Sequence, residues 1–335
     1  MDNSQHFFYR ADDRSYYSII KKEVRKMTEA AGFSATKLGE LDIVVAEMTS
    51  NLNKHAKGGE IFFRVAGPAD RVFAEVICVD EGPGFSESGA MIKDGYSSMG
   101  TLGHGLGSIS RLSDEFDMYS LKGWGTILFS RIYAQRPSKT RQQAGFWGLN
   151  VPLNGEIYSG DGYCFEETKE GFKILMADGL GHGQEAHLAV TTACTAFAQC
   201  TETSPAETIR ALHHAVRKTR GLVGIVVFFN RHTKTWLIAG VGNYALRWIS
   251  GNTYKNHASY NGIIGHSIPN TINDSIVRQE DFSHFIACSD GLKSKWELSK
   301  FPMIGRHHSM VQATALLKEF SRKTDDASVV ICKTA

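Results

Sequence analysis

The chain has 335 residues, with 37 lysine and arginine residues against 35 aspartate and glutamate residues, for a net charge of +2. This balance argues against a nucleic acid or a membrane surface as the main partner. The length predicts about two domains, and 42% hydrophobic residues indicate a globular protein. The longest strongly apolar run, 221–229, is far shorter than the ~20 residues of a spanning helix. No signal peptide is visible, so we expect a cytoplasmic protein.

The six cysteines form no C-x-x-C pair, and most stand in apolar sequence. We expect buried free thiols, with a zinc site or a disulfide framework as the alternative. The cysteines are Cys78, Cys164, Cys194, Cys200, Cys288 and Cys332.

The first part of the chain alternates helical and strand patterns. Apolar residues at helical spacing predict helices over 15–32 and 34–56, the second capped by Ser34. The expected strands are 58–67 and 71–82, which we expect to pair as a hairpin, and a final hairpin over 116–133. Between them lies a glycine-rich segment from Gly95 to Gly107, followed by a short helix over 105–116.

The composition changes at 134–145, which holds three basic residues, one proline, no acidic residue and no large apolar residue. We interpret it as a linker between a domain over 1–133 and a domain over 146–335. The second domain has strand patterns over 146–153, 160–168, 171–178, 223–230, 235–242, 244–250, 284–290 and 327–333, and helical patterns over 183–200, 205–220 and 309–323.

Polar residues in the first domain fall at positions that suit a nucleotide. Glu47, Asn51 and His55 are spaced i, i+4, i+8 and share one helix face, which could also be a solvated surface. Asp80 ends a strand and opens a D-x-G-x-G turn. The glycine-rich segment then leads into a helix, where backbone amides suit a triphosphate.

In order and spacing, these segments resemble the GHKL ATPase fold shared by gyrase, Hsp90, histidine kinases and anti-sigma-factor serine kinases. The matching stretches are AEMTSNLNKHA, DEGPGF and LGHGLGSISRLSDEFDMYSLKGWGT, and the resemblance covers residues 5–133. It is similar above all to the small serine kinase of the bacterial stressosome, which phosphorylates STAS-domain proteins. No histidine-kinase dimerisation helix pair precedes the pocket, so phosphohistidine signalling is not expected.

The resemblance implies a role for each matching residue. Glu47 would polarise the attacking group and Asn51 would hold Mg²⁺ beside ATP. Asp80 would read the adenine amino group, with Thr126 helping through a water. The glycines implied to shape the lid and admit the phosphates are Gly82, Gly84, Gly100, Gly103, Gly105 and Gly107.

Four separate strand ends of the second domain each deliver an aspartate: Asp161, Asp178, Asp290 and the pair Asp325–Asp326. One such aspartate is usually a cap or turn former. Four gathered carboxylates would repel one another and raise one another's pKa, and hard divalent cations such as Mg²⁺ and Mn²⁺ resolve this conflict. Two such ions would activate a bridging water for in-line attack on phosphorus.

The stretch MADGLGHG, Met176 to Gly183, contains Asp178. It is therefore interpreted as a turn that presents ligands to a metal (the metal turn) and not as a phosphate-binding loop. Its glycines would let the chain turn sharply and bring a backbone carbonyl, that of Gly179, to a metal. A dinucleotide-binding interpretation fails because no fitting acidic residue closes a βαβ unit. His182 is expected only to cap the following helix, while the pairs His213–His214 and His307–His308 are expected at the surface.

The ordered set GDGY, ADGLGHG, RGLVGIVVFF, VGN, SDG and DDASVV resembles the metal-dependent serine/threonine phosphatases of the 2C type, over residues 146–333. It is similar in particular to the sporulation-phosphatase (SpoIIE) branch and its short stressosome feedback phosphatase. The resemblance implies that Asp178 bridges two metals and that Asp161, Asp290 and Asp325 complete the shells. Asp325 aligns better than Asp326, and no arginine is evident for the substrate phosphate.

The two resemblances together imply an α+β protein of two domains, an N-terminal GHKL (Bergerat) α/β sandwich and a C-terminal αββα phosphatase sandwich. The expected function is a bifunctional regulator of partner switching. A serine kinase-like domain and a phosphatase would act on the same STAS-domain partner. The alternatives are a phosphatase gated by a non-catalytic ATP-sensing domain and a non-enzymatic scaffold, which would have no need to keep four costly carboxylates.

Overall fold

The structure is a computed structural model, and it describes residues 5–11, 15–56, 58–85, 102–136, 145–251 and 253–334. The chain divides into two compact units. The first comprises His6–Arg141 and Glu297–Lys318, and the second comprises Asp2–Gln5, Gln142–Trp296 and Glu319–Ala335. The sequence pattern placed residues 297–318 in the second domain, whereas this division by contacts places them in the first unit. The predicted domain boundaries stay a prediction.

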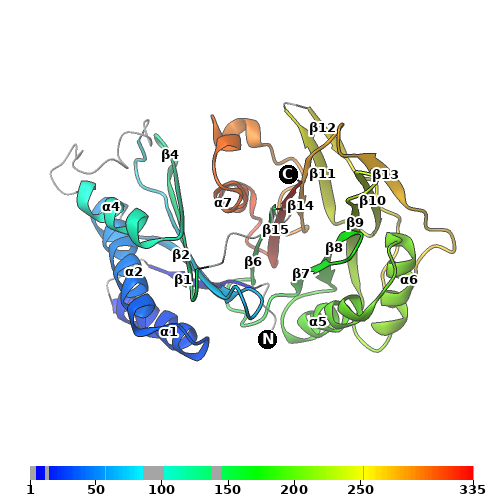
Figure 1. The fold of residues 1–335 in the computed structure, drawn as a ribbon, viewed down its shortest axis with the longest axis horizontal. Coiled ribbons are helices and arrows are strands. Elements are labelled where there is room, and N and C mark those ends of the chain that lie inside the picture. Colours follow the sequence, from blue (N-terminus) through cyan, green and yellow to red (C-terminus); the bar gives the residue numbers. More distant parts are fainter. Residues whose placement is uncertain are drawn as a thin grey trace. The chain divides into compact units, whose positions relative to one another are not determined.

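The first unit is built on an antiparallel sheet of five strands in the order β1-β2-β3-β5-β4. Helices α1, α2 and α4 cover one face of this sheet (Figure 1). The strands are β1 (Phe7–Arg10), β2 (Gly59–Ala66), β3 (Phe73–Asp80), β4 (Glu115–Leu121) and β5 (Gly125–Tyr133). The helices are α1 (Ser15–Ala30), α2 (Ala35–His55), α4 (Leu102–Leu112), the short η1 (Leu298–Lys300) and η2 (Ile304–Arg306), and α7 (Ser309–Phe320).

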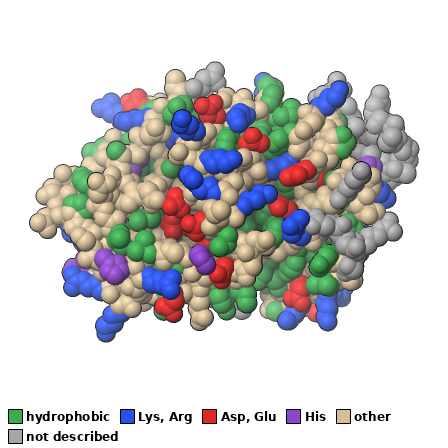
Figure 2. All heavy atoms as spheres, turned by 180° about the vertical axis from the view of Figure 1, so that it is seen from behind, with side chains coloured by type: hydrophobic (Ala, Val, Ile, Leu, Met, Phe, Trp, Pro, Cys, Tyr) green, Lys and Arg blue, Asp and Glu red, His purple; other side chains and the backbone are tan. Residues whose placement is uncertain are grey.

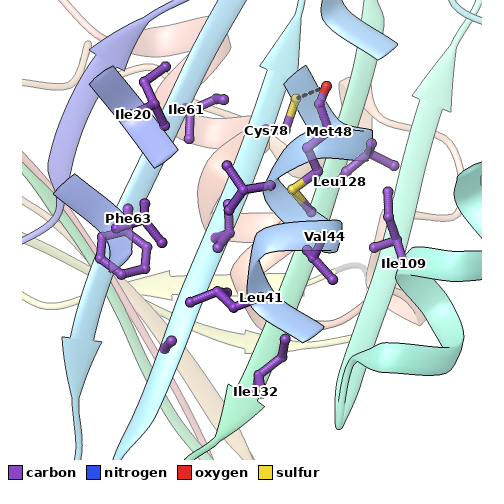
Figure 3. Packing of buried hydrophobic residues seen from close by; sticks show 14 of the residues in the cluster. Ile20, Leu41, Val44, Met48, Ile61, Phe63, Cys78, Ile109, Leu128 and Ile132 are labelled. Carbon is purple, nitrogen blue, oxygen red and sulfur yellow. Dashed lines mark hydrogen bonds between the residues drawn. The ribbon is translucent and has the colours of Figure 1, made fainter. Parts of the chain in front are cut away.

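The apolar stripe of α2 makes the core of this unit. Leu41, Val44 and Met48 are at most 1% exposed and pack in one cluster with Ile61 of β2 and Leu128 of β5 (Figure 3). Burying each such side chain contributes about 1.5–3 kcal/mol. The predicted stripe is confirmed, and it fixes the rotation of α2 about its own axis. The face of α2 that carries Glu47 and Asn51 is thereby fixed as well.

The second unit contains two antiparallel five-stranded sheets, β13-β10-β9-β8-β7 and β12-β11-β14-β15-β6. Their strands are β6 (Gly145–Val151), β7 (Asp161–Glu167), β8 (Gly171–Gly179), β9 (Leu222–Asn230), β10 (Thr235–Val241), β11 (Ala245–Ser250), β12 (Thr253–Asn256), β13 (Ser275–Arg278), β14 (His284–Cys288) and β15 (Ala327–Lys333). Helices α5 (Gln184–Gln199) and α6 (Pro205–Ala215) pack on the first of these sheets (Figure 1).

Aromatic side chains from both sheets form the core between them. Phe172 and Trp236 come from the first sheet, and Trp248 and Phe285 come from the second. The rings of Trp236 and Trp248 lie 5.4 Å apart, at a spacing typical of favourable aromatic pairs. This core holds the two sheets face to face, so the ends of β7 and β8 have a rigid base.

Most predicted elements are confirmed, and the differences have local causes. The side chain of Ser34 accepts a hydrogen bond from the Lys37 amide, as expected for the cap of α2. α4 begins at Leu102, three residues before the predicted start, because its glycines are tolerated inside the helix. α6 ends at Ala215, five residues before the predicted end. The short strands β1, β12 and β13 were not predicted, since four residues carry little periodicity.

The prediction of free thiols is wrong for one pair. Cys164 of β7 and Cys194 of α5 form a disulfide, with Cα atoms 6.0 Å apart. Packing of α5 on β7 brings together two residues 30 positions apart, a separation that carries no sequence signal. The remaining cysteines, Cys78, Cys200, Cys288 and Cys332, are free.

Charges are mixed over the surface. On the face of the described residues drawn in Figure 2, basic and acidic side chains lie interspersed. None of the helices in the described ranges is long and apolar enough to cross a membrane.

Candidate functional site

Glu47 and Asn51 lie near Gly105 of α4. The stripe that buries Leu41 and Met48 leaves these two side chains half-buried and directed at the neighbouring helix. A Cβ placed on Gly105 would lie 2.6 Å from Glu47 Oε2 and 3.9 Å from Asn51 Oδ1. The polar face of α2 is therefore not the solvated surface that its spacing also allowed, because it lines a close helix–helix approach.

Asp80 lies at the end of β3, where two backbone amides hold its carboxylate. Its Oδ1 accepts hydrogen bonds from the Gly82 amide at 2.7 Å and from the Thr126 amide at 3.2 Å. Burial raises the pKa of Asp80, against the opposing effects of the Gly82 amide and of Lys318. Asp80 and Thr126, which lie 46 positions apart, thus share one site.

The turns around Asp80 leave no room for a side chain. Gly84 has φ +57°, and a Cβ there would lie 2.1 Å from the Leu121 carbonyl oxygen. Gly82 packs against the carbonyl of His55 at the end of α2. Of the other predicted glycines, Gly103, Gly105 and Gly107 lie within α4 and Gly100 lies outside the described residues.

Asp161 and Asp178 stand directly opposite each other in the register of β7 and β8. Asp161 is 1% exposed, and its Oδ2 is a buried oxygen without a hydrogen-bond partner. Burial, against the opposing Ser289 hydrogen bond, raises the pKa of Asp161 to about 8, with Asp326 and Asp290 adding to the rise. Burial also raises the pKa of Asp178 well above its usual value, and the charge of Asp161 adds to this effect.

The remaining carboxylates have distinct partners. Asp290 Oδ2 accepts a hydrogen bond from Asn243 Nδ2 at 2.8 Å. Asp326 uses both oxygens on backbone amides, those of Leu153 at 2.7 Å and Gly160 at 2.8 Å. Among the residues that the structure describes, Asp325 accepts a hydrogen bond only from the amide of its neighbour Asp326. These contacts favour Asp325 over Asp326 as a free ligand, since Asp326 holds the loop that precedes Asp161.

The chemistry of the aspartates suits divalent cations. Within the described ranges no three His, Cys, Asp or Glu side chains form a ready-made metal cage. The same carboxylates nevertheless raise one another's pKa. The buried Oδ2 of Asp161, which has no hydrogen-bond partner, favours a metal site. Burying such an oxygen costs free energy unless a cation or a hydrogen-bond donor binds it. We therefore infer that these residues fit Mg²⁺ or Mn²⁺.

Comparison with known proteins gives the fold family of each part. Residues 10–130 match the model of the histidine kinase-like ATPase domain. The serine/threonine-protein kinase RsbT of Bacillus subtilis (strain 168) is 29% identical over 102 residues, which are 30% of this chain and 77% of RsbT. The N-terminal part therefore has the fold of the histidine kinase-like ATPase domain.

Solved structures match the other part of the chain. A crystal structure of RsbX in complex with magnesium has a TM-score of 0.51 and 15% identity, covering 59% of this chain and 98% of that one. A structure described by the words "The bacterial stressosome: a modular system that has been adapted to control secondary messenger signaling" has a TM-score of 0.51 and 22% identity, covering 58% and 100%. Beside its ATPase domain, the chain therefore has the fold of 2C-type phosphatases, as predicted.

The histidines differ from their predicted roles. His182 does not cap α5, whose N-cap is Gly183 without a side-chain hydrogen bond; His182 Nδ1 instead lies 2.8 Å from Glu156 Oε1. In the first unit, His307 lies 3.1 Å from Asp117 Oδ1, and the ring of His308 stacks on Phe129. This pair is therefore half-buried and not at the surface, because both residues pack on the sheet of the ATPase domain.

Sequence reasoning missed several supporting residues. Lys318 of α7 donates a hydrogen bond from Nζ to the Asp80 carbonyl oxygen at 2.6 Å, and its ammonium lies 3.8 Å from the centre of the Trp124 ring. No local pattern could reveal this contact across 238 positions. The hydroxyls of Ser289 and Ser328 oppose the rise in the pKa of Asp161 that its burial causes. Their places beside Asp290 and after Asp326 were the signal that could have found them.

Proposed function

We propose that the second unit is a metal-dependent protein phosphatase that removes phosphate from a serine or threonine of a STAS-domain partner. The observation that carries this proposal is the unpartnered buried Oδ2 of Asp161, directly across the sheet from Asp178. The fold shared with 2C-type phosphatases supports the same chemistry. The proposed ligands are Asp161, Asp178, the Gly179 carbonyl, Asp290 and Asp325.

Mg²⁺ or Mn²⁺ bound there would supply an activated water and charge stabilisation for attack on phosphorus. The chain's own residues orient the ligands. Asn243 fixes Asp290 through its amide hydrogen bond, and the hydroxyls of Ser289 and Ser328 lower the pKa of Asp161. Asp326 ties the loop before β7 to the start of β15, so the ligands rest on strand ends and not on free loops.

We propose further that the ATPase domain binds Mg²⁺-ATP and transfers phosphate to the same partner. Asp80 would accept the adenine amino group, Asn51 would hold Mg²⁺, and Glu47 would polarise the attacking hydroxyl. The similarity to a protein named as a serine/threonine kinase supports this role. A tether between opposing activities would raise the local concentration of each at a shared substrate.

A second candidate function is favoured by the contact of Lys318 with Asp80. The α7 segment, which reaches the adenine end of the proposed pocket, ends at Phe320, five residues before Asp325. ATP binding could thus gate the phosphatase without any phosphotransfer. ATP-dependent stimulation of the phosphatase rate without labelled product would distinguish this function from the first.

The deciding experiment uses the Asp178→Asn protein, in which added phosphate should remain on the partner. It is incubated with γ-labelled ATP, Mg²⁺ and a panel of purified STAS-domain proteins. Labelled serine or threonine, erased by adding wild-type chain, would support both activities. Label that persists in the presence of wild-type chain and Mn²⁺ would contradict the phosphatase. The matched control is Asp281→Asn, which changes an exposed aspartate and should behave as wild type.

Absence of label despite measurable ATP binding would leave the gated phosphatase as the better account. Absence of both phosphotransfer and Mn²⁺-dependent hydrolysis would leave the non-enzymatic scaffold.

A further inference from the structure

An arginine absent from the predicted site lies beside the turn that follows Asp178. A Cβ placed on Gly181 would lie 3.1 Å from Nη1 of Arg220. Gly181 has φ +82°, a left-handed conformation that favours glycine. Because this glycine has no side chain, the guanidinium can lie directly against the turn. This proximity links Arg220 to the strand end that carries Asp178.

Backbone contacts hold Arg220 in this place. The Leu180 amide donates to the Gly221 carbonyl at 3.1 Å, and Gly179 pairs with Leu222 in the register of β8 and β9. The carbonyl of Arg220 itself lies 2.8 Å from Nε2 of His266. The peptide segment around Arg220 is thus fastened to the metal turn, and only its side chain is left to reach outward.

The guanidinium has no acidic partner of its own. Arg220 is exposed, and within the described part of the chain it forms no ion pair. Glu156, the acidic residue beside the same turn, pairs with His182. The charge of Arg220 is therefore available to an anion that enters the site.

We propose that Arg220 binds the phosphoryl oxygens of the substrate at the phosphatase site. A guanidinium presents paired N–H donors that match two oxygens of a phosphate group. This inference rests on the proposed phosphatase function, and it supplies the phosphate-orienting arginine that the sequence motifs lack. Arg220 is thus a substrate-binding residue, while the aspartates hold the metals.

The test compares Arg220→Ala with Arg217→Ala, an exposed arginine three positions earlier in the same connection. Mn²⁺-dependent hydrolysis of a phosphoserine peptide is measured in the full chain, together with inhibition by inorganic phosphate. In Arg220→Ala we expect KM and the phosphate inhibition constant to rise about 10-fold to 100-fold, the loss typical of a charged hydrogen bond. Arg220→Lys should recover part of this loss, and Arg217→Ala should match wild type.

The outcomes separate the two proposals. Absence of metal-dependent hydrolysis in the wild-type chain would overturn the phosphatase function, and the role of Arg220 with it. Wild-type hydrolysis with unchanged KM and unchanged phosphate inhibition in Arg220→Ala would overturn the role of Arg220 alone. A fall in kcat without any change in these two constants would overturn it as well, since a merely structural effect acts in that way.

Discussion

One helical glycine lies against another side chain and a second has open space around it. Substituting each with alanine therefore tests the role of Glu47. Gly105 of α4 faces the Glu47 carboxylate, whereas a Cβ placed on Gly39 of α2 would meet no atom within 4 Å. In Gly105→Ala the new methyl group would displace the Glu47 carboxylate from its place beside Asn51. We expect ATP affinity, measured by calorimetry, to fall by at least about 10-fold, which corresponds to about 1.4 kcal/mol.

Gly39→Ala is the matched control for this change. It should raise the free energy of unfolding by up to about 1 kcal/mol, because alanine is the better helix former, and it should leave ATP affinity unchanged. Equal ATP affinities in both variants would show that Glu47 lies outside the nucleotide site.

The Asp80 carboxylate has one oxygen engaged by backbone amides and must accept any further donor with the other. In Asp80→Asn an amide donor would face the adenine amino group, which is itself a donor. A loss of about 100-fold in ATP affinity is expected, since a buried donor is left without a partner. Titration of the exposed variant Asp70→Asn, with the same loss of charge, should give the wild-type affinity.

Between elements, the disulfide joins β7, which carries Asp161, to α5, which follows the turn after Asp178. Alkylation of the unfolded chain without reductant should modify four cysteines, and six after reduction. Reduction should lower the free energy of unfolding by about 2–4 kcal/mol, because the bond restricts the unfolded chain. Six modified cysteines before reduction would contradict the bond.

A charged network joins strands on one face of the first sheet. Glu75 of β3 is 0% exposed and bonds Arg64 of β2 and Arg131 of β5. Glu115 of β4 bonds Arg131 and His308, and these partners outweigh burial to lower the pKa of Glu115 to about 2. Because the unfolded carboxyl has a pKa near 4.3, this stabilisation is present above about pH 4.3.

The stabilisation by Glu115 should be lost as the pH falls from about 4.3 to about 2. It amounts to less than about 3 kcal/mol, since Glu115 is partly exposed. Denaturant unfolding at a series of pH values should show a shallower acid loss in Glu115→Gln. Glu202→Gln, at an exposed position, should follow the wild-type curve. Parallel curves for all three proteins would rule out the network as the cause.

At the scale of the molecule, periodicity predicted most helices and strands because burial imposes it locally. The stripe of Leu41, Val44 and Met48 and the strand ends at Asp80 and Asp178 are examples. Contacts across the chain left no such pattern. The Cys164–Cys194 bond and the approach of Lys318 to Asp80 depend on packing, and sequence spacing does not report packing. The roles of the site residues stay predictions.

The first unit consists of two separate chain segments, and this predicts how truncation affects its stability. A fragment of residues 1–141 lacks His307 and His308, which contact Asp117 and Glu115 in the intact unit. We expect the fragment to melt at a lower temperature than the same unit in the full chain. Calorimetry on both proteins would measure the difference, and an unchanged transition would show that residues 297–318 add no stability.

The chain leaves the first unit at Arg141 and returns to it at Glu297. The first unit therefore cannot complete its fold before most of the second unit has been synthesised. Its sheet is made early, but its last helix reaches the ribosome exit only after most of the second unit has been translated. During that interval Glu115 and Asp117 of β4 lack their contacts with His308 and His307. Complete assembly of the first unit therefore requires synthesis of most of the second, and a chain that ends before Glu297 would release the first unit without its last segment.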